Sequence, residues 1–186
     1  MKTRDIPNLI CIARILLVPP IVLLLLQGNF AMGLVLFALA GASDGLDGFL
    51  ARRFDWRSRL GAILDPLADK LLMVASYATL GWMGVLPWWL VVLVLIRDVV
   101  IISGALVYHR FCGRVEMDPS RISKANTVFQ IMLVLMAMVM QAGLTLPQWG
   151  LTAMIVIVTG TTLMSGAGYV WEWSHRANRC RNGDGD

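Results

Sequence analysis

The chain has 186 residues, of which 58% are hydrophobic and 15% are charged, with 16 Lys and Arg against 12 Asp and Glu. Water-soluble domains contain about 45–50% apolar and about 25% charged residues, so this composition excludes a soluble globule and a disordered chain. The three cysteines form no C-x-x-C motif, which argues against a disulfide framework and a zinc site. The length suits one domain, and the composition excludes a nucleic-acid-binding tail.

Several apolar segments are long enough to cross a membrane, which takes about 20 residues in a helix. Six windows meet this requirement: 8–26, 30–51, 61–80, 87–108, 122–140 and 147–169. The first is longer than the apolar part of a signal peptide and no small-residue cleavage site follows it, so we interpret it as a helix. The sequence therefore predicts an all-α integral membrane protein with six transmembrane helices over residues 1–173 and a disordered polar tail at 174–186.

The basic residues lie on one side of this array: at the N-terminus, between the second and third segments, between the fourth and fifth, in the tail, or in adjoining parts of the helices. The alternate connectors, residues 27–29, 81–86 and 141–146, contain no charged residue. Cytoplasmic loops carry the excess of Lys and Arg, so we expect both termini in the cytoplasm. No Arg-rich transit segment begins the sequence, which favours a bacterial inner membrane.

Four aspartates lie within the predicted second and third helices, where a carboxylate is costly. Asp44 and Asp47 are three residues apart, and Asp65 and Asp69 are four apart, so each pair lies on one helix face. A short loop joins the two helices, so the two faces can meet. Four carboxylates in a low-dielectric site need a positive counter-charge, and oxygen ligands suit Mg²⁺ or Mn²⁺. Four carboxylates can also hold two ions, the arrangement used in phosphoryl-group displacement.

Simpler interpretations exist for each aspartate alone. Asp65 followed by Pro66 is typical of a helix start, in which the aspartate caps the helix. Asp44 can lie closer to the lipid headgroups, and Asp69 can form a local ion pair with Lys70. These explanations account for single residues but leave the shared spacing to coincidence.

Small residues and an arginine accompany the aspartates. Gly48, Ala51 and Gly61 leave the helix faces bare, so a bulky ligand can approach the backbone there. Arg52 follows the aspartates directly and can bind a phosphate through its guanidinium. Alternatively, the arginines of this loop contact lipid headgroups, because the placement of basic residues on the cytoplasmic side already accounts for them.

The combined pattern resembles the signature of the CDP-alcohol phosphotransferase family, whose members are expected to have a similar number of spans. The residues that carry the resemblance are Asp44-x-x-Asp47-Gly48-x-x-Ala51-Arg52, then eight residues, then Gly61-x-x-x-Asp65-x-x-x-Asp69. The resemblance implies a membrane enzyme that transfers a phosphatidyl or similar group from a CDP-linked donor to an alcohol and releases CMP. It also implies a homodimer.

The resemblance assigns a role to each motif residue. Asp44, Asp47 and Asp65 would hold one metal ion, while Asp44, Asp65 and Asp69 would hold the other. Asp69 would also be the catalytic base for the acceptor hydroxyl. The residues implied to line the CDP site are Gly48, Ala51, Arg52 and Gly61.

The second half of the chain contains candidates for acceptor binding. Arg97 lies inside the fourth apolar segment, where it either pairs with Asp98 or another carboxylate, or binds the phosphate of the acceptor. Lys124 and Asn126 enter the fifth segment from the cytoplasmic side, where Lys124 can instead anchor to headgroups. The pair Arg97-Asp98 and the stretch Ser123-Lys124-x-Asn126-Thr127 are similar to the cardiolipin synthase branch of the family.

That similarity implies CDP-diacylglycerol as donor and phosphatidylglycerol as the favoured acceptor. Phosphatidylglycerophosphate synthases usually have Arg-Glu and Gly-Lys-x-Lys-Thr at these places, but glycerol 3-phosphate stays an alternative acceptor. Asn8 and Arg14 resemble the first helix of the family. Arg14 can line the cavity or lie at the headgroup boundary. A divalent-cation transporter would also place aspartates on facing helices, yet the far ends of the second and third segments are apolar.

Overall fold

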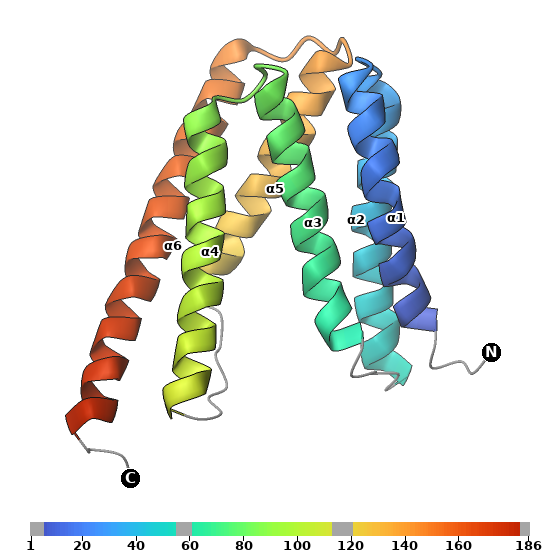
Figure 1. Cartoon of the computed structure of the whole chain (residues 1–186). Helices are drawn as coiled ribbons and strands as arrows, with labels where there is room; N and C mark the ends of the chain where they lie inside the picture. The colour runs from blue at the N-terminus through green and yellow to red at the C-terminus, as the bar shows by residue number, and fades with distance from the viewer. Residues whose placement is uncertain (1–5, 55–60, 113–120, 183–186) are drawn as a thin grey trace. The chain divides into compact units, whose positions relative to one another are not determined.

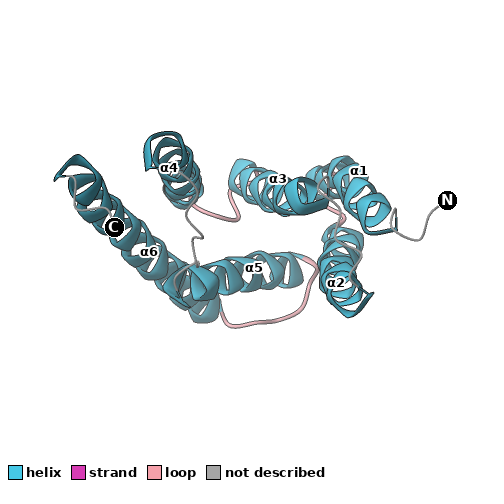
Figure 2. Ribbon diagram, turned by 90° about the horizontal axis from the view of Figure 1, so that it is seen from below, coloured by secondary structure: helices cyan, strands magenta, loops and turns pink. Residues whose placement is uncertain are grey.

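The computed structural model describes residues 6–54, 61–112 and 121–182, and their side chains in the ranges 11–43, 66–104 and 122–169. Within these ranges the chain is helical, with short connectors and no strand (Figures 1 and 2). The helices are α1 Ile6–Leu26, α2 Phe30–Phe54, α3 Gly61–Trp82, α4 Trp88–Cys112, α5 Arg121–Gln141 and α6 Gln148–Asn182. The six helices expected from the apolar segments are confirmed.

Three of these helices end in the same backbone motif. Gly28, Gly84 and Gly143 have positive φ angles of 76°, 73° and 96° after α1, α3 and α5. At the end of α1, the amide of Gly28 donates to the carbonyl of Leu25 and the amide of Asn29 to that of Leu24, both at 2.9 Å. This is the Schellman arrangement, which needs a residue that tolerates a left-handed backbone. The charge-free connectors are therefore tight turns closed by glycine.

The sixth helix is longer than the sequence predicted. We expected a disordered tail from residue 174, but α6 continues as helix to Asn182. Residues 174–182 contain neither Gly nor Pro, and the first glycine after the apolar segment is Gly183. Because no helix-stopping residue precedes Gly183, the polar composition alone did not end the helix.

The helices form two compact groups. The first group consists of Met1–Leu86 and Val134–Leu146, and the second of Pro87–Leu133 and Pro147–Asp186. In the first group α1 packs against both α2 and α3, and in the second group α4 packs against α6. The single domain expected over residues 1–173 stays a prediction.

The core of the first group is built from close contacts along α1. Ile21 and Leu25, one turn apart on α1, are buried, as are Phe30 and Phe37 on α2. A Cβ atom added to Gly33 would lie 2.9 Å from Cδ2 of Leu25, closer than side-chain atoms pack. A glycine at this position thus lets α2 approach α1.

The described surface is rich in large apolar side chains. Leu16, Val99, Val156 and Met164 are among those exposed, while Arg14, Arg97 and Asn126 are buried. Apolar side chains outside and charged side chains inside are typical of helices in contact with lipid. By length and composition, Ile122–Gln141 and Gln148–Tyr169 can each cross a membrane, and Cys11–Leu26 and Phe30–Ser43 are shorter apolar helices.

Candidate functional site

The motif aspartates occupy two helices of the first group. Asp44 and Asp47 lie in α2, and Asp65 and Asp69 lie in α3. The C-terminal end of α2 and the N-terminal ends of α1 and α3 lie at the same end of this group (Figure 1). At about 1.5 Å per residue, the four aspartates lie about 6–15 Å along their helices from these ends. The fold thus brings both halves of the signature to one end of the helices packed on α1.

The structure describes the side chain of only one of these aspartates, Asp69. The side chains of the remaining signature residues lie outside the described ranges: Asp44, Asp47, Gly48, Ala51, Arg52, Gly61 and Asp65. Their proposed contacts with metal or CDP therefore stay predictions. Because α3 begins at Gly61, however, Asp65 lies inside the helix and is not its N-terminal cap.

Asp69 is held by an arginine of the first helix. Nη1 of Arg14 donates a hydrogen bond to Oδ1 of Asp69 at 2.6 Å, and the two charged groups form an ion pair. The Arg14 side chain is 1% exposed, whereas that of Asp69 is 46% exposed. The carboxylate is thus held from the protein interior while part of the Asp69 side chain stays exposed.

Sequence reasoning missed this partner of Asp69. It placed Arg14 either at a cavity wall or at the headgroup boundary, whereas Arg14 is buried against Asp69. The sequence feature that could have indicated this pair is the equal distance of the two residues from the starts of their helices. Arg14 is eight positions after Ile6 and Asp69 is eight positions after Gly61, so each lies about 12 Å along a helix that starts at the same end.

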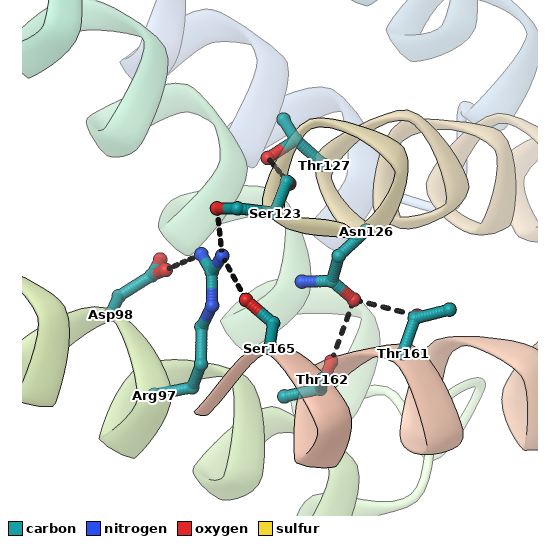
Figure 3. A network of polar contacts seen from close by, with 8 residues as sticks. All are labelled: Arg97, Asp98, Ser123, Asn126, Thr127, Thr161, Thr162 and Ser165. Atoms are coloured by element: carbon teal, nitrogen blue, oxygen red, sulfur yellow. Dashed lines mark hydrogen bonds and ion pairs between the residues drawn. The ribbon is translucent and has the colours of Figure 1, made fainter. Parts of the chain in front are cut away.

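A second polar cluster lies in the second group, around Arg97 of α4 (Figure 3). Nη1 of Arg97 donates to Oδ1 of Asp98 at 2.8 Å, and its Nη2 donates to Oγ of Ser123 at 2.5 Å and to Oγ of Ser165 at 2.8 Å. Arg97 is 6% exposed. The ion pair with Asp98, one of the two alternatives for Arg97, is therefore present, and the same guanidinium joins α4 to α5 and α6.

The amide of Asn126 forms the other half of this cluster (Figure 3). Its Oδ1 accepts hydrogen bonds from the hydroxyl groups of Thr161 at 2.7 Å and Thr162 at 3.0 Å. Asn126 is fully buried between α5 and α6, whereas Lys124, two residues earlier, is exposed. Of the three acceptor-binding candidates, Arg97 and Asn126 are thus buried and hydrogen-bonded to residues of α6, whereas Lys124 is exposed.

The buried ion pair predicts a large effect on stability. Replacing one partner of such a pair leaves the other charge buried and costs about 3–5 kcal/mol, while replacing both by apolar residues is often neutral. We expect Arg97→Met to lower the free energy of unfolding in detergent micelles by about this amount. Adding Asp98→Leu should recover most of the loss. A double variant as unstable as Arg97→Met would show that the loss does not come from leaving the Asp98 carboxylate without its partner.

Comparison with known proteins reveals clear relatives. A family model described as CDP-alcohol phosphatidyltransferase matches residues 4–165. The human cardiolipin synthase (CMP-forming) is 38% identical over 146 residues, covering 69% of this chain and 48% of that protein. A chloroplastic CDP-diacylglycerol–glycerol-3-phosphate 3-phosphatidyltransferase of rice is 35% identical over 184 residues, covering 89% of this chain and 56% of that protein.

A bacterial relative also matches. The putative cardiolipin synthase of Mycobacterium bovis is 33% identical over 127 residues, covering 68% of this chain and 60% of that protein. The chain therefore spans about half the length of the curated relatives that it matches. Because the family model covers most of the chain and includes the whole aspartate signature, the chain belongs to the CDP-alcohol phosphatidyltransferase family.

Proposed function

We propose that the protein transfers a phosphatidyl group from CDP-diacylglycerol to an alcohol and releases CMP. The observation that carries this proposal is the placement of both halves of the aspartate signature at one end of the helices packed on α1, with Asp69 held there by Arg14. The family membership and the names of the relatives support the same chemistry.

The reaction would begin at the acceptor hydroxyl. Asp69 would take its proton, and the oxygen would attack the phosphorus attached to diacylglycerol. The new phosphorus–oxygen bond would replace the bond to the phosphate of CMP, which leaves. A positioned carboxylate contributes about 10²–10⁴-fold to such a step.

The chemistry of the signature aspartates fits a divalent metal ion. The donor set consists of carboxylates, which suit Mg²⁺ or Mn²⁺, and the described member, Asp69, is partly exposed. Asp44, Asp47 and Asp65 would complete the ligands of two ions. A bound divalent cation would neutralise the charge that develops on the diphosphate as the bond to CMP breaks.

For the acceptor we propose phosphatidylglycerol, so that the product is cardiolipin. Two of the relatives reported above carry the name cardiolipin synthase, and one is a glycerol-3-phosphate phosphatidyltransferase, so glycerol 3-phosphate is the alternative. In this proposal Gly48, Ala51, Arg52 and Gly61 line the CDP site. The residues proposed to face the acceptor are Arg97, Lys124 and Asn126.

The proposal includes a membrane topology. Six helices would span the bilayer with both termini in the cytoplasm, which places the aspartates on the basic, cytoplasmic side. The charge-free connectors of the first group lie at the opposite end from the aspartates, in agreement with this orientation (Figure 1). We also propose a homodimer in a bacterial inner membrane.

The acceptor assay tests the proposed function. Purified protein in detergent receives CDP-diacylglycerol, Mg²⁺ and either phosphatidylglycerol or glycerol 3-phosphate, and lipid products are identified by mass spectrometry. We expect cardiolipin with the first acceptor and little phosphatidylglycerophosphate with the second. The reverse preference would assign the alternative acceptor, and no product with either would contradict the proposal.

A further inference from the structure

We propose that Arg14 is a positioning residue that orients the Asp69 carboxylate for its reaction with the acceptor hydroxyl. This inference rests on the function proposed above. It is carried by the 2.6 Å contact between Nη1 of Arg14 and Oδ1 of Asp69, and by the contrast between a fully buried guanidinium and a half-exposed carboxylate.

The burial of Arg14 restricts the conformations of its side chain, which donates a hydrogen bond to Asp69. A guanidinium stays charged in proteins, and inside an apolar helix bundle it needs a carboxylate partner. Residues close to the pair along its two helices are buried as well, Cys11 on α1 and Ala68 and Leu72 on α3. Because a buried side chain has few conformations open to it, Arg14 presents its N–H group to Asp69 from a restricted range of directions.

Topology does not explain an arginine at this position. Basic residues that set orientation lie in loops or near helix ends, whereas Arg14 is about 12 Å into α1 at the same depth as Asp69 in α3. Burying a guanidinium lowers the stability of the fold. The partner of this guanidinium is Asp69, the carboxylate proposed to act as the base.

The contact has two consequences for Asp69. One carboxylate oxygen accepts the hydrogen bond of Arg14, so rotation of the carboxylate about its terminal bond is already restricted. Less rotational freedom is therefore lost when the acceptor hydroxyl binds. The permanent positive charge also offsets repulsion among the aspartates at this end of the helices, because charges interact strongly in a low-dielectric site.

The test compares variants of the full chain in detergent. Arg14→Gln removes the charge and Arg14→Lys retains it. Ile21→Ala, also on α1 and buried in the same group of helices, is the matched control for loss of packing. For each variant, kcat and KM for CDP-diacylglycerol are measured by CMP release, and the unfolding midpoint is measured alone and combined with Asp69→Asn.

We expect Arg14→Gln to lower kcat by about 10–100-fold, the loss typical for partners that orient active-site ligands. Since ground-state binding is not removed, KM should change by less than about threefold. Arg14→Lys should recover part of kcat, and Ile21→Ala should lose stability but retain kcat. Once Asp69→Asn is present, Arg14→Gln should lower the unfolding midpoint less than it does in the wild-type chain.

Failure of the positioning role is distinguishable from failure of the proposed function. If the wild-type protein releases CMP and Arg14→Gln does so with an unchanged kcat, the positioning role is wrong while the proposed function stands. The positioning role is also wrong if kcat of Arg14→Gln falls only in proportion to the loss of folded protein, as in Ile21→Ala. A wild-type protein that releases no CMP would overturn the proposed function and the role of Arg14 together.

Discussion

Asp69→Asn is expected to lower CMP release by about 10²–10⁴-fold, because the amide cannot accept the proton of the acceptor hydroxyl. The substitution keeps the size and shape of the side chain, and the amide oxygen can still accept the hydrogen bond of Arg14. The loss should therefore appear in kcat at saturating acceptor, measured as the rate of CMP formation per folded protein. The unfolding midpoint should fall as well, because the buried Arg14 loses its carboxylate partner.

A matched variant distinguishes loss of the catalytic base from a disturbance of the fold. Asp69→Glu retains a carboxylate but moves it by one methylene from the position fixed by Arg14, so we expect a loss smaller than that of Asp69→Asn. An Asp69→Asn protein with the wild-type rate of CMP release would show that another group takes the proton.

Removal of divalent cations is expected to abolish activity. Metal ions contribute several kcal/mol to transition states of this kind, which converts to a loss of at least about 10³-fold after treatment with a chelator. Addition of Mg²⁺ or Mn²⁺ should restore the rate of CMP release. Asp44→Asn, which removes a proposed ligand of both ions, should raise the Mg²⁺ concentration needed for half of the maximal rate.

The control for this experiment is the secondary structure of the chelated protein. The chelated protein should keep the wild-type far-ultraviolet circular dichroism spectrum, since α1 and the helices packed on it have an apolar core that includes Ile21, Leu25 and Phe37. Full activity of a chelated, metal-free preparation would contradict the proposed role of the aspartates.

Much of the fold follows from local signals in the sequence. The helix boundaries agree with the apolar segments, and each of the three charge-free connectors contains a glycine that allows the turn. The end of α6 was predicted wrongly, because the polar composition after residue 173 does not stop the helix, which continues to Asn182, directly before Gly183. A helix can continue through polar residues once it leaves the apolar layer.

The candidate site could be proposed from regular spacing along single helices, but its contacts between helices could not be predicted from the sequence. Asp44, Asp47, Asp65 and Asp69 are found from periods of three and four residues along two helices. The Arg14–Asp69 pair joins residues 55 positions apart and depends on α1 packing against α3. The same holds for Arg97, whose neighbour Asp98 was predictable but whose contacts with Ser123 and Ser165 depend on three helices.

In the proposed function, release of CMP is coupled to transfer of the phosphatidyl group onto an alcohol. The most direct test follows both products of radiolabelled CDP-diacylglycerol in one reaction with phosphatidylglycerol and Mg²⁺. We expect CMP and cardiolipin to form in equal amounts, and neither to form when the acceptor is omitted. CMP released at the same rate without acceptor, with phosphatidic acid as the lipid product, would identify a hydrolase and contradict the proposed transfer.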